Sequence, residues 1–92
     1  MRIEKHETEI IGKLVLKEGK LVKDANCLRI YDLTENYLRK IVTDDSGWCV
    51  LFQDPHDDRY WELVYLESYM QGGGPPSLLN IGNRLDKYKI EL

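Results

Sequence analysis

The sequence contains few of the residues from which enzyme and metal sites are built. Only two cysteines and two histidines occur in 92 residues. The spacings C-x-x-C, H-E-x-x-H and that of an EF-hand loop are all missing, so no familiar metal-ligand pattern is present. No serine stands in the G-x-S-x-G turn that exposes a catalytic nucleophile. We therefore expect no catalytic residue, no metal site and no cofactor.

Long apolar runs are also missing. No run approaches the roughly 20 residues that a membrane-spanning helix needs, and the first nine residues are too polar for a signal peptide. We therefore expect a cytoplasmic protein without membrane contact. In that compartment, buried thiols at Cys27 and Cys49 are favoured over the alternative, a disulfide between them. The length, with 42% apolar and 32% charged residues, indicates one globular domain over residues 1–92.

The net charge of −3 is distributed unevenly along the chain. Residues 44–71 carry seven acidic residues, one arginine and six of the nine aromatic residues. Phosphate contacts need Lys and Arg, so no nucleic-acid partner is expected, whereas an acidic aromatic surface suits a basic protein. The alternative is a solvated acidic hairpin whose aromatic side chains lie in the core. The predicted partner-binding residues are Asp44, Asp45, Asp54, His56, Asp57, Asp58 and Glu67.

A helix is predicted over residues 24–42, preceded by a strand at 9–16 and a turn at Gly19. Asp24 or Asn26 is suited to cap its N-terminus. Apolar residues then recur at helical spacing, at Cys27, Tyr31, Leu38 and Ile41. Arg39 and Lys40 would occupy the last turn, where cations complement the helix dipole.

Two strands are predicted at 48–53 and 59–66, joined by a turn rich in Asp and Pro. The second strand has apolar residues on both faces, which is typical of a central strand. A further strand is expected at 77–82. These elements predict a small single α+β domain with a largely antiparallel sheet and one main helix.

The loop Gly72, Gly73, Gly74, Pro75 and Pro76 is predicted to be a fixed connection between strands. Only 18 residues follow Gly74, which is too few for a second domain joined by a flexible linker. A phosphate-binding loop is disfavoured because proline has no N–H to donate. We expect an ordered loop in which at least one glycine has a positive φ.

Two short strings, YWEL and GGGPP, carry a resemblance that extends over residues 46–78. The residues concerned are Gly47, Trp48, Asp54, Pro55, Asp58, Arg59, Tyr60, Trp61, Glu62, Leu63, Tyr65, Ser68, Gly72, Gly73, Gly74, Pro75, Pro76 and Leu78. In these residues the chain resembles the immunity protein 27 family of bacterial polymorphic-toxin systems. The stretch 35–48 is also similar to that family. The family commonly has an acid and a histidine before the glycines. Here residues 69–71 are Tyr, Met and Gln, so no role of that histidine is carried over.

The resemblance implies a mostly β domain, encoded beside a secreted toxin, that binds the cognate toxin domain and blocks it. It implies an inhibitor and not an enzyme. Many such toxins are nucleases with basic substrate grooves, which an acidic inhibitor complements. Two alternatives stay open at this point. One is a small metal-binding or enzymatic domain that uses His56 and its neighbouring acids, and the other is an accessory domain that forms homo-oligomers.

Overall fold

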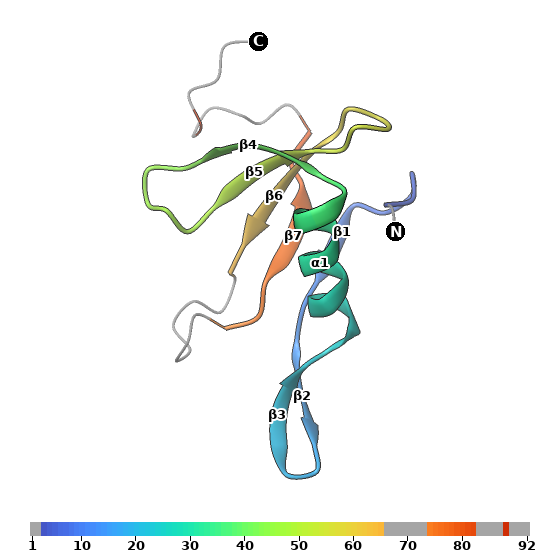
Figure 1. The fold of residues 1–92 in the computed structure, drawn as a ribbon, viewed down its shortest axis with the longest axis vertical. Helices are drawn as coiled ribbons and strands as arrows, with labels where there is room; N and C mark the ends of the chain where they lie inside the picture. The colour runs from blue at the N-terminus through green and yellow to red at the C-terminus, as the bar shows by residue number, and fades with distance from the viewer. Residues whose placement is uncertain (1–2, 66–73, 83–87, 89–92) are drawn as a thin grey trace.

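The computed structural model describes residues 3–65, 74–82 and 88, which form one helix and seven strands in two sheets (Figure 1). The elements are β1 Glu9–Ile11, β2 Leu14–Lys17, β3 Lys20–Lys23, α1 Ala25–Asn36, β4 Arg39–Thr43, β5 Val50–Gln53, β6 Tyr60–Val64 and β7 Ser77–Asn80. The main sheet has the strand order β1-β7-β6-β5-β4, and every neighbouring pair is antiparallel. The predicted α+β class, with one main helix and a largely antiparallel sheet, is confirmed.

Helix α1 begins where the sequence indicates but ends earlier. The side chain of Asp24 caps it by accepting a hydrogen bond from the Cys27 N–H at 2.9 Å. The helix stops at Asn36, so the predicted end at residue 42 is wrong, and Arg39–Thr43 forms strand β4. The β-branched run Ile41-Val42-Thr43 favours an extended backbone, and Val42 and Thr43 pair with β5 after a bulge at Ile41. The helical spacing of the apolar residues beyond Asn36 was coincidental.

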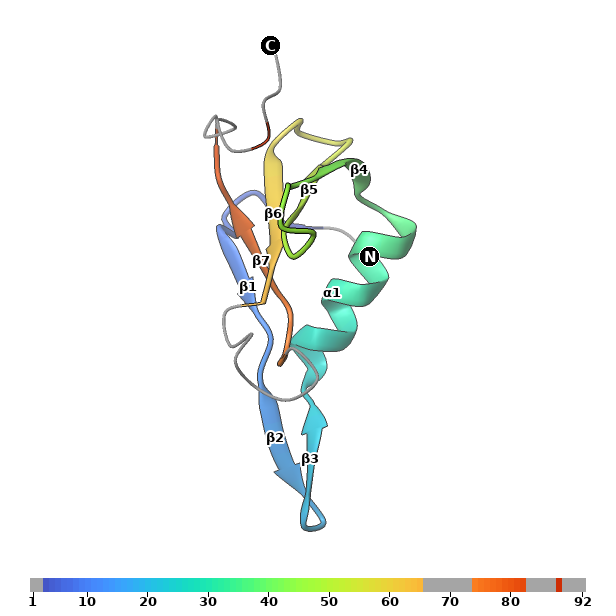
Figure 2. The ribbon, with the colours of Figure 1, turned by 90° about the vertical axis from the view of Figure 1, so that its left-hand side faces the viewer.

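The core lies between α1 and one face of the main sheet (Figure 2). Strand β6 is central, as predicted, and lies between β5 and β7. Its Trp61 is fully buried. The buried residues of this cluster are Ile3, Ile10, Ile30, Leu33, Leu38, Phe52, Trp61 and Leu78. A smaller cluster on Leu51, Ile81 and Tyr88 is separate from it.

The end of the glycine-proline loop is fixed against the first strand. Gly74 has a φ of 71°, which is the conformation predicted for at least one of these glycines. Pro75 and Pro76 are buried. The Pro76 carbonyl accepts a hydrogen bond from the Gly12 N–H at 3.0 Å. Gly72 and Gly73 lie outside the described residues.

Gly12 is the position where this close approach excludes a side chain. A Cβ there would lie 2.2 Å from the Pro76 carbonyl oxygen and 2.7 Å from the Cys27 Sγ. The predicted continuous strand 9–16 therefore divides at Gly12 into β1 and β2, which belong to different sheets. Cys27 is buried, Cys49 is half-buried, and neither forms a disulfide.

We expect Gly12→Ala to lower the free energy of unfolding by about 2 kcal/mol or more, because backbone has to move to make room for the methyl group. Urea denaturation followed by circular dichroism measures this. Gly19→Asn is the matched control, because nothing lies within 4 Å of a Cβ at Gly19 and asparagine tolerates its positive φ. Equal stability of Gly12→Ala and the wild type would contradict the described packing.

Strands β2 and β3 form a two-stranded hairpin that projects from the body of the protein (Figures 1 and 2). We call residues 14–23 the arm. Glu18 and Gly19 both have positive φ, at 52° and 78°, which is the geometry of a type I′ hairpin turn. All residues of the arm except Leu14 are exposed.

Candidate partner-binding surface

The predicted acidic residues are divided between two turns at opposite ends of strand β5. Asp44 and Asp45 lie in the turn before it, whereas Asp57 and Asp58 lie in the β5–β6 turn after it (Figure 1). Glu67 lies outside the described residues. The charge pattern of the sequence therefore does not correspond to one acidic patch.

Asp54 holds the β5–β6 turn from inside. It is fully buried, and its Oδ1 accepts hydrogen bonds from the Tyr37 hydroxyl at 2.7 Å and the His56 N–H at 2.8 Å. Its backbone N–H donates to the Arg59 carbonyl at 2.9 Å. Asp54 was predicted to contact a partner, but its carboxylate does not reach the surface. Its contacts join the turn to Tyr37, at the C-terminal end of α1.

Arg59 fastens the N-terminal segment to the same turn. Its guanidinium donates to the backbone carbonyls of Glu4 at 3.0 Å and Glu7 at 2.7 Å. It also forms an ion pair with Asp57 at 2.6 Å and lies 5.1 Å from the centre of the Trp61 ring. Burial alone would raise the pKa of the Asp57 carboxyl, but the hydrogen bonds from Arg59 outweigh this effect and hold that pKa below its ordinary value. Asp57 is therefore engaged within the fold.

A second ion pair joins the N-terminal segment to the helix. The guanidinium of Arg29 donates two hydrogen bonds to the Glu7 carboxylate, at 2.6 and 2.7 Å. These bonds lower the pKa of Glu7 from 4.5 to about 2. Because the pKa is depressed in the folded state, the stabilisation is present above pH 4.5 and is lost as the pH falls toward 2.

We expect Glu7→Gln to destabilise the protein at pH 7 by about 1 kcal/mol, since both side chains keep some contact with water. The difference from the wild type should fall by about half between pH 7 and pH 3. Urea denaturation at several pH values measures it, with Glu35→Gln on the exposed face of α1 as the control. A difference that is independent of pH would contradict the assigned ion pair.

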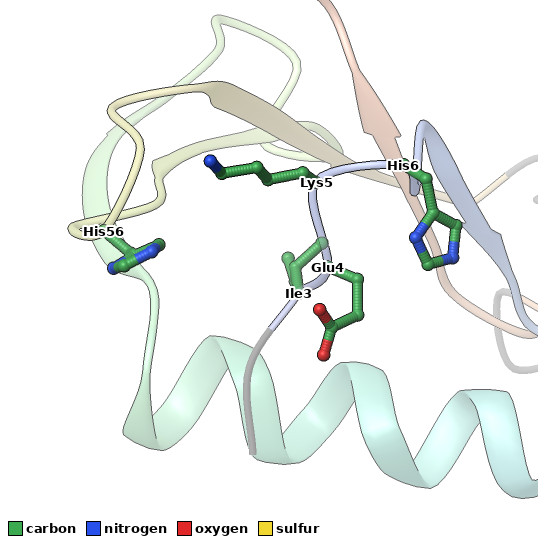
Figure 3. Close-up of a pocket in the computed structure, with 5 residues that line it drawn as sticks. All are labelled: Ile3, Glu4, Lys5, His6 and His56. Atoms are coloured by element: carbon green, nitrogen blue, oxygen red, sulfur yellow. The ribbon is translucent and has the colours of Figure 1, made fainter.

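His56 lines an open pocket of about 270 Å³ together with Ile3, Glu4, Lys5 and His6. Figure 3 shows that the side chain of His6 points away from His56, so the two imidazoles do not converge on one point. Across residues 3–65, 74–82 and 88, no group of three or more His, Cys, Asp or Glu side chains is placed to hold a metal ion. The described geometry gives no support to the metal-binding alternative.

The turn between β4 and β5 is organised by a single carboxylate. Asp44 Oδ1 accepts hydrogen bonds from the Ser46 hydroxyl at 2.7 Å and the Gly47 N–H at 3.1 Å. The Ser46 hydroxyl oxygen in turn accepts one from the Trp48 N–H at 3.1 Å. The bond from Ser46 is the main reason that the pKa of Asp44 is lowered. We call residues 44–48 the Asp44–Trp48 turn.

Trp48 is the exposed aromatic residue of this turn. Its side chain is 56% exposed and contacts Tyr65 edge to face, with ring centres 6.2 Å apart. Tyr31 and Lys23 are close enough to Tyr65 to influence its pKa, which is raised mainly by burial. Lys23 also lies 5.0 Å from the centre of the Tyr31 ring. An aromatic strip therefore extends from the Asp44–Trp48 turn toward the base of the arm.

The predicted strand 48–53 includes Trp48, and the alternation of side chains in a strand would place it on the same face as Val50 and Phe52. Phe52 and Val50 do pack in the core beside α1, but the strand ends before Trp48 and leaves it exposed. Ser46 and Gly47, which directly precede Trp48, are typical turn residues and indicate that Trp48 belongs to a turn.

The opposite face of the sheet carries one buried acid. Glu62 of the YWEL string accepts a hydrogen bond from the Tyr88 hydroxyl at 2.6 Å. Burial is the main cause that raises the pKa of Tyr88, followed by this bond. Glu62 therefore belongs to the packing of the domain.

Comparison with known protein families gives one decisive result. The model of the family described as immunity protein 27 matches residues 16–82. The chain belongs to the immunity protein 27 family. The match begins in strand β2 of the arm and extends beyond β7, so it includes α1, both turns and the glycine-proline loop. The resemblance noted in the sequence is confirmed.

This family consists of immunity proteins, so the membership assigns the chain to toxin systems. No curated protein and no solved structure matches the chain. Within the described ranges, no helix is long and apolar enough to cross a membrane.

Proposed function

We propose that this protein binds and neutralises a cognate bacterial toxin domain encoded nearby, and that the Asp44–Trp48 turn is its principal contact. Membership of the immunity protein 27 family supports the class of function. The observation that carries the choice of surface is Trp48, a large aromatic side chain that is exposed and held by a hydrogen-bonded turn. The inhibitor acts by occupying the toxin and has no catalytic residue.

A tryptophan presented in this way has the properties of a binding hot spot. Tryptophan, tyrosine and arginine dominate the binding energy of protein interfaces. Bonds of Asp44 to Gly47 and to Cys49 fix the backbone on either side of Trp48 before a partner arrives. Less conformational freedom is then lost on binding, which favours affinity.

The acidic side chains beside Trp48 suit a basic toxin surface. Asp45 is exposed in the same turn, and the half-buried Asp44 precedes it in the chain. The negative charge of this turn attracts a basic partner and speeds its association. In this proposal the toxin has a basic groove, as a nuclease has, and is neutralised in the cytoplasm.

Co-expression tests the proposal. The toxin domain encoded next to this chain should arrest growth when expressed alone and should be tolerated when this chain is present. Both proteins should then purify as one complex. Full toxicity in the presence of the folded protein would refute the proposal.

Asp45→Lys should slow association with the toxin several-fold at low salt and change dissociation little, because rim charges act mainly on the encounter. Stopped-flow kinetics at several salt concentrations measures both rates. Glu9→Lys makes the same charge change on β1, at the other edge of the sheet, and serves as the control. Equal slowing by both variants would show that net charge matters and the position of Asp45 does not.

A further inference from the structure

The arm exposes apolar side chains on both faces of a two-stranded ribbon. Leu16 is 73% exposed and Leu21 is 64% exposed, and the two residues face each other across the ribbon. Val15 and Val22 form the adjacent pair and are also exposed. A two-stranded hairpin is marginally stable in water by itself, and exposed apolar patches mark sites of association. These features indicate that the arm packs against another surface.

The charges of the arm restrict what that surface is. Within residues 14–23 there are three lysines and one glutamate. Lys17 and Lys20 face each other at the tip, and both are exposed. The lysines of the arm would form ion pairs with acidic side chains of a partner surface, and its exposed leucines would pack against a large apolar side chain there. Two arms would repel each other, so direct pairing of arms is disfavoured.

This chain itself carries such a surface. The Asp44–Trp48 turn presents exposed Asp45 and exposed Trp48 within four residues of the sequence. We propose that the protein forms a two-fold symmetric homodimer in which the arm of each copy packs on the Asp44–Trp48 turn of the other. The leucines on one face of the arm cover Trp48. Lys17 and Lys20 leave the opposite face at the tip, and their long side chains reach around the end of the ribbon to Asp45.

The symmetry follows from the size of the contact. A stable interface buries roughly 1,200 Å² or more, and one narrow ribbon on one turn is a small contact. A two-fold axis repeats the contact, because each copy supplies one arm and one turn. A one-sided contact would leave an arm uncovered at one end of a growing chain of molecules and a turn uncovered at the other end. In the reciprocal dimer both arms and both turns are covered.

The dimer has a consequence for function. It covers the same Trp48 that the proposed function assigns to the toxin, so the toxin and a second copy compete for the turn. Dimerisation is measured without any toxin, so the result of that experiment does not depend on the proposed function.

Sedimentation velocity over micromolar to hundreds of micromolar protein measures the association. The wild type should pass from monomer to dimer in this range. Leu16→Ser combined with Leu21→Ser should weaken dimerisation at least tenfold. Leu28→Ser is the matched control, because Leu28 is 63% exposed on α1, and it should leave the dimer unchanged. A wild type that stays monomeric, or an arm variant that dimerises as the wild type does, overturns the proposal.

A charge exchange provides the sharper test. Asp45→Lys alone and Lys20→Glu alone each place like charges at both contacts, so both variants should be largely monomeric. When the two variants are mixed, every contact of the mixed dimer joins opposite charges. In one contact the native Lys20 meets the native Asp45, and in the other the two substituted side chains meet with their charges exchanged.

The mixture should therefore dimerise about as well as the wild type. Lys17→Glu replaces Lys20→Glu if circular dichroism shows that the latter misfolds. A mixture of two folded variants that remains monomeric overturns the proposal.

Discussion

Trp48→Ala should weaken toxin binding by about 30-fold or more, which corresponds to the roughly 2 kcal/mol that defines a hot spot. The indole is exposed in the free protein, so a partner can surround it fully. Its removal also deletes the edge-to-face contact with Tyr65, but little buried area is lost within the domain. The melting temperature should therefore change by only a few degrees.

Surface plasmon resonance at nanomolar protein concentration measures this effect, since self-association does not compete there. Leu28→Ala is the control, because Leu28 is exposed to a similar extent but lies on α1 outside the turn. We expect its affinity to stay within a factor of two of the wild type. If Trp48→Ala binds as tightly as Leu28→Ala does, the Asp44–Trp48 turn is not the principal contact.

Arg59→Ala should lower the free energy of unfolding by about 3 kcal/mol and the melting temperature by about 10 °C or more. One guanidinium joins Asp57, three backbone carbonyls of the N-terminal segment and the face of Trp61. Its loss leaves these groups without their partner. Amide exchange in residues 3–8 should become faster at the same time.

The Arg59→Lys variant distinguishes the contribution of the planar guanidinium from that of the positive charge alone. Lysine keeps the positive charge near Asp57 but has no planar fork to reach several carbonyls together. It should recover less than half of the lost stability. Arg39→Ala is the control, because Arg39 is exposed on edge strand β4. Full recovery by lysine would show that charge alone fixes the N-terminal segment.

Much of the architecture was predictable from the sequence because local signals agreed with the fold. Turn residues around Gly19 and at 54–58 separate β-rich segments, and each marks a real hairpin. Asp24 was a correct cap. The end of the helix was not predictable in this way. Leu38 is buried in the bend between α1 and β4, and a longer helix would bury it as well, so its apolar character does not mark where the helix ends.

The site was less predictable than the fold because charge in a sequence does not reveal burial. Asp54, Asp57 and Asp58 look equivalent in the string DPHDD. Asp54 is inside, Asp57 pairs with Arg59, and Asp58 is exposed with a positive φ of 63°. A triple charge reversal of these residues would therefore damage the fold, and Asp45 is the cleaner probe of the acidic field.

The residues that carry the family resemblance also include both buried and exposed side chains. Asp54, Arg59, Trp61 and Pro76 hold the fold through buried contacts. Trp48 differs, since most of its side chain is open to solvent. This difference supports two separate roles for these residues. The buried ones stabilise the fold, and the Asp44–Trp48 turn contacts the partner.

Isothermal titration of this protein with the toxin domain encoded beside it tests the central claim most directly. The account predicts saturable binding with one chain per toxin domain and a nanomolar dissociation constant, with most of the affinity lost in Trp48→Ala. Absence of binding between the two folded proteins, or full affinity in Trp48→Ala, would contradict it.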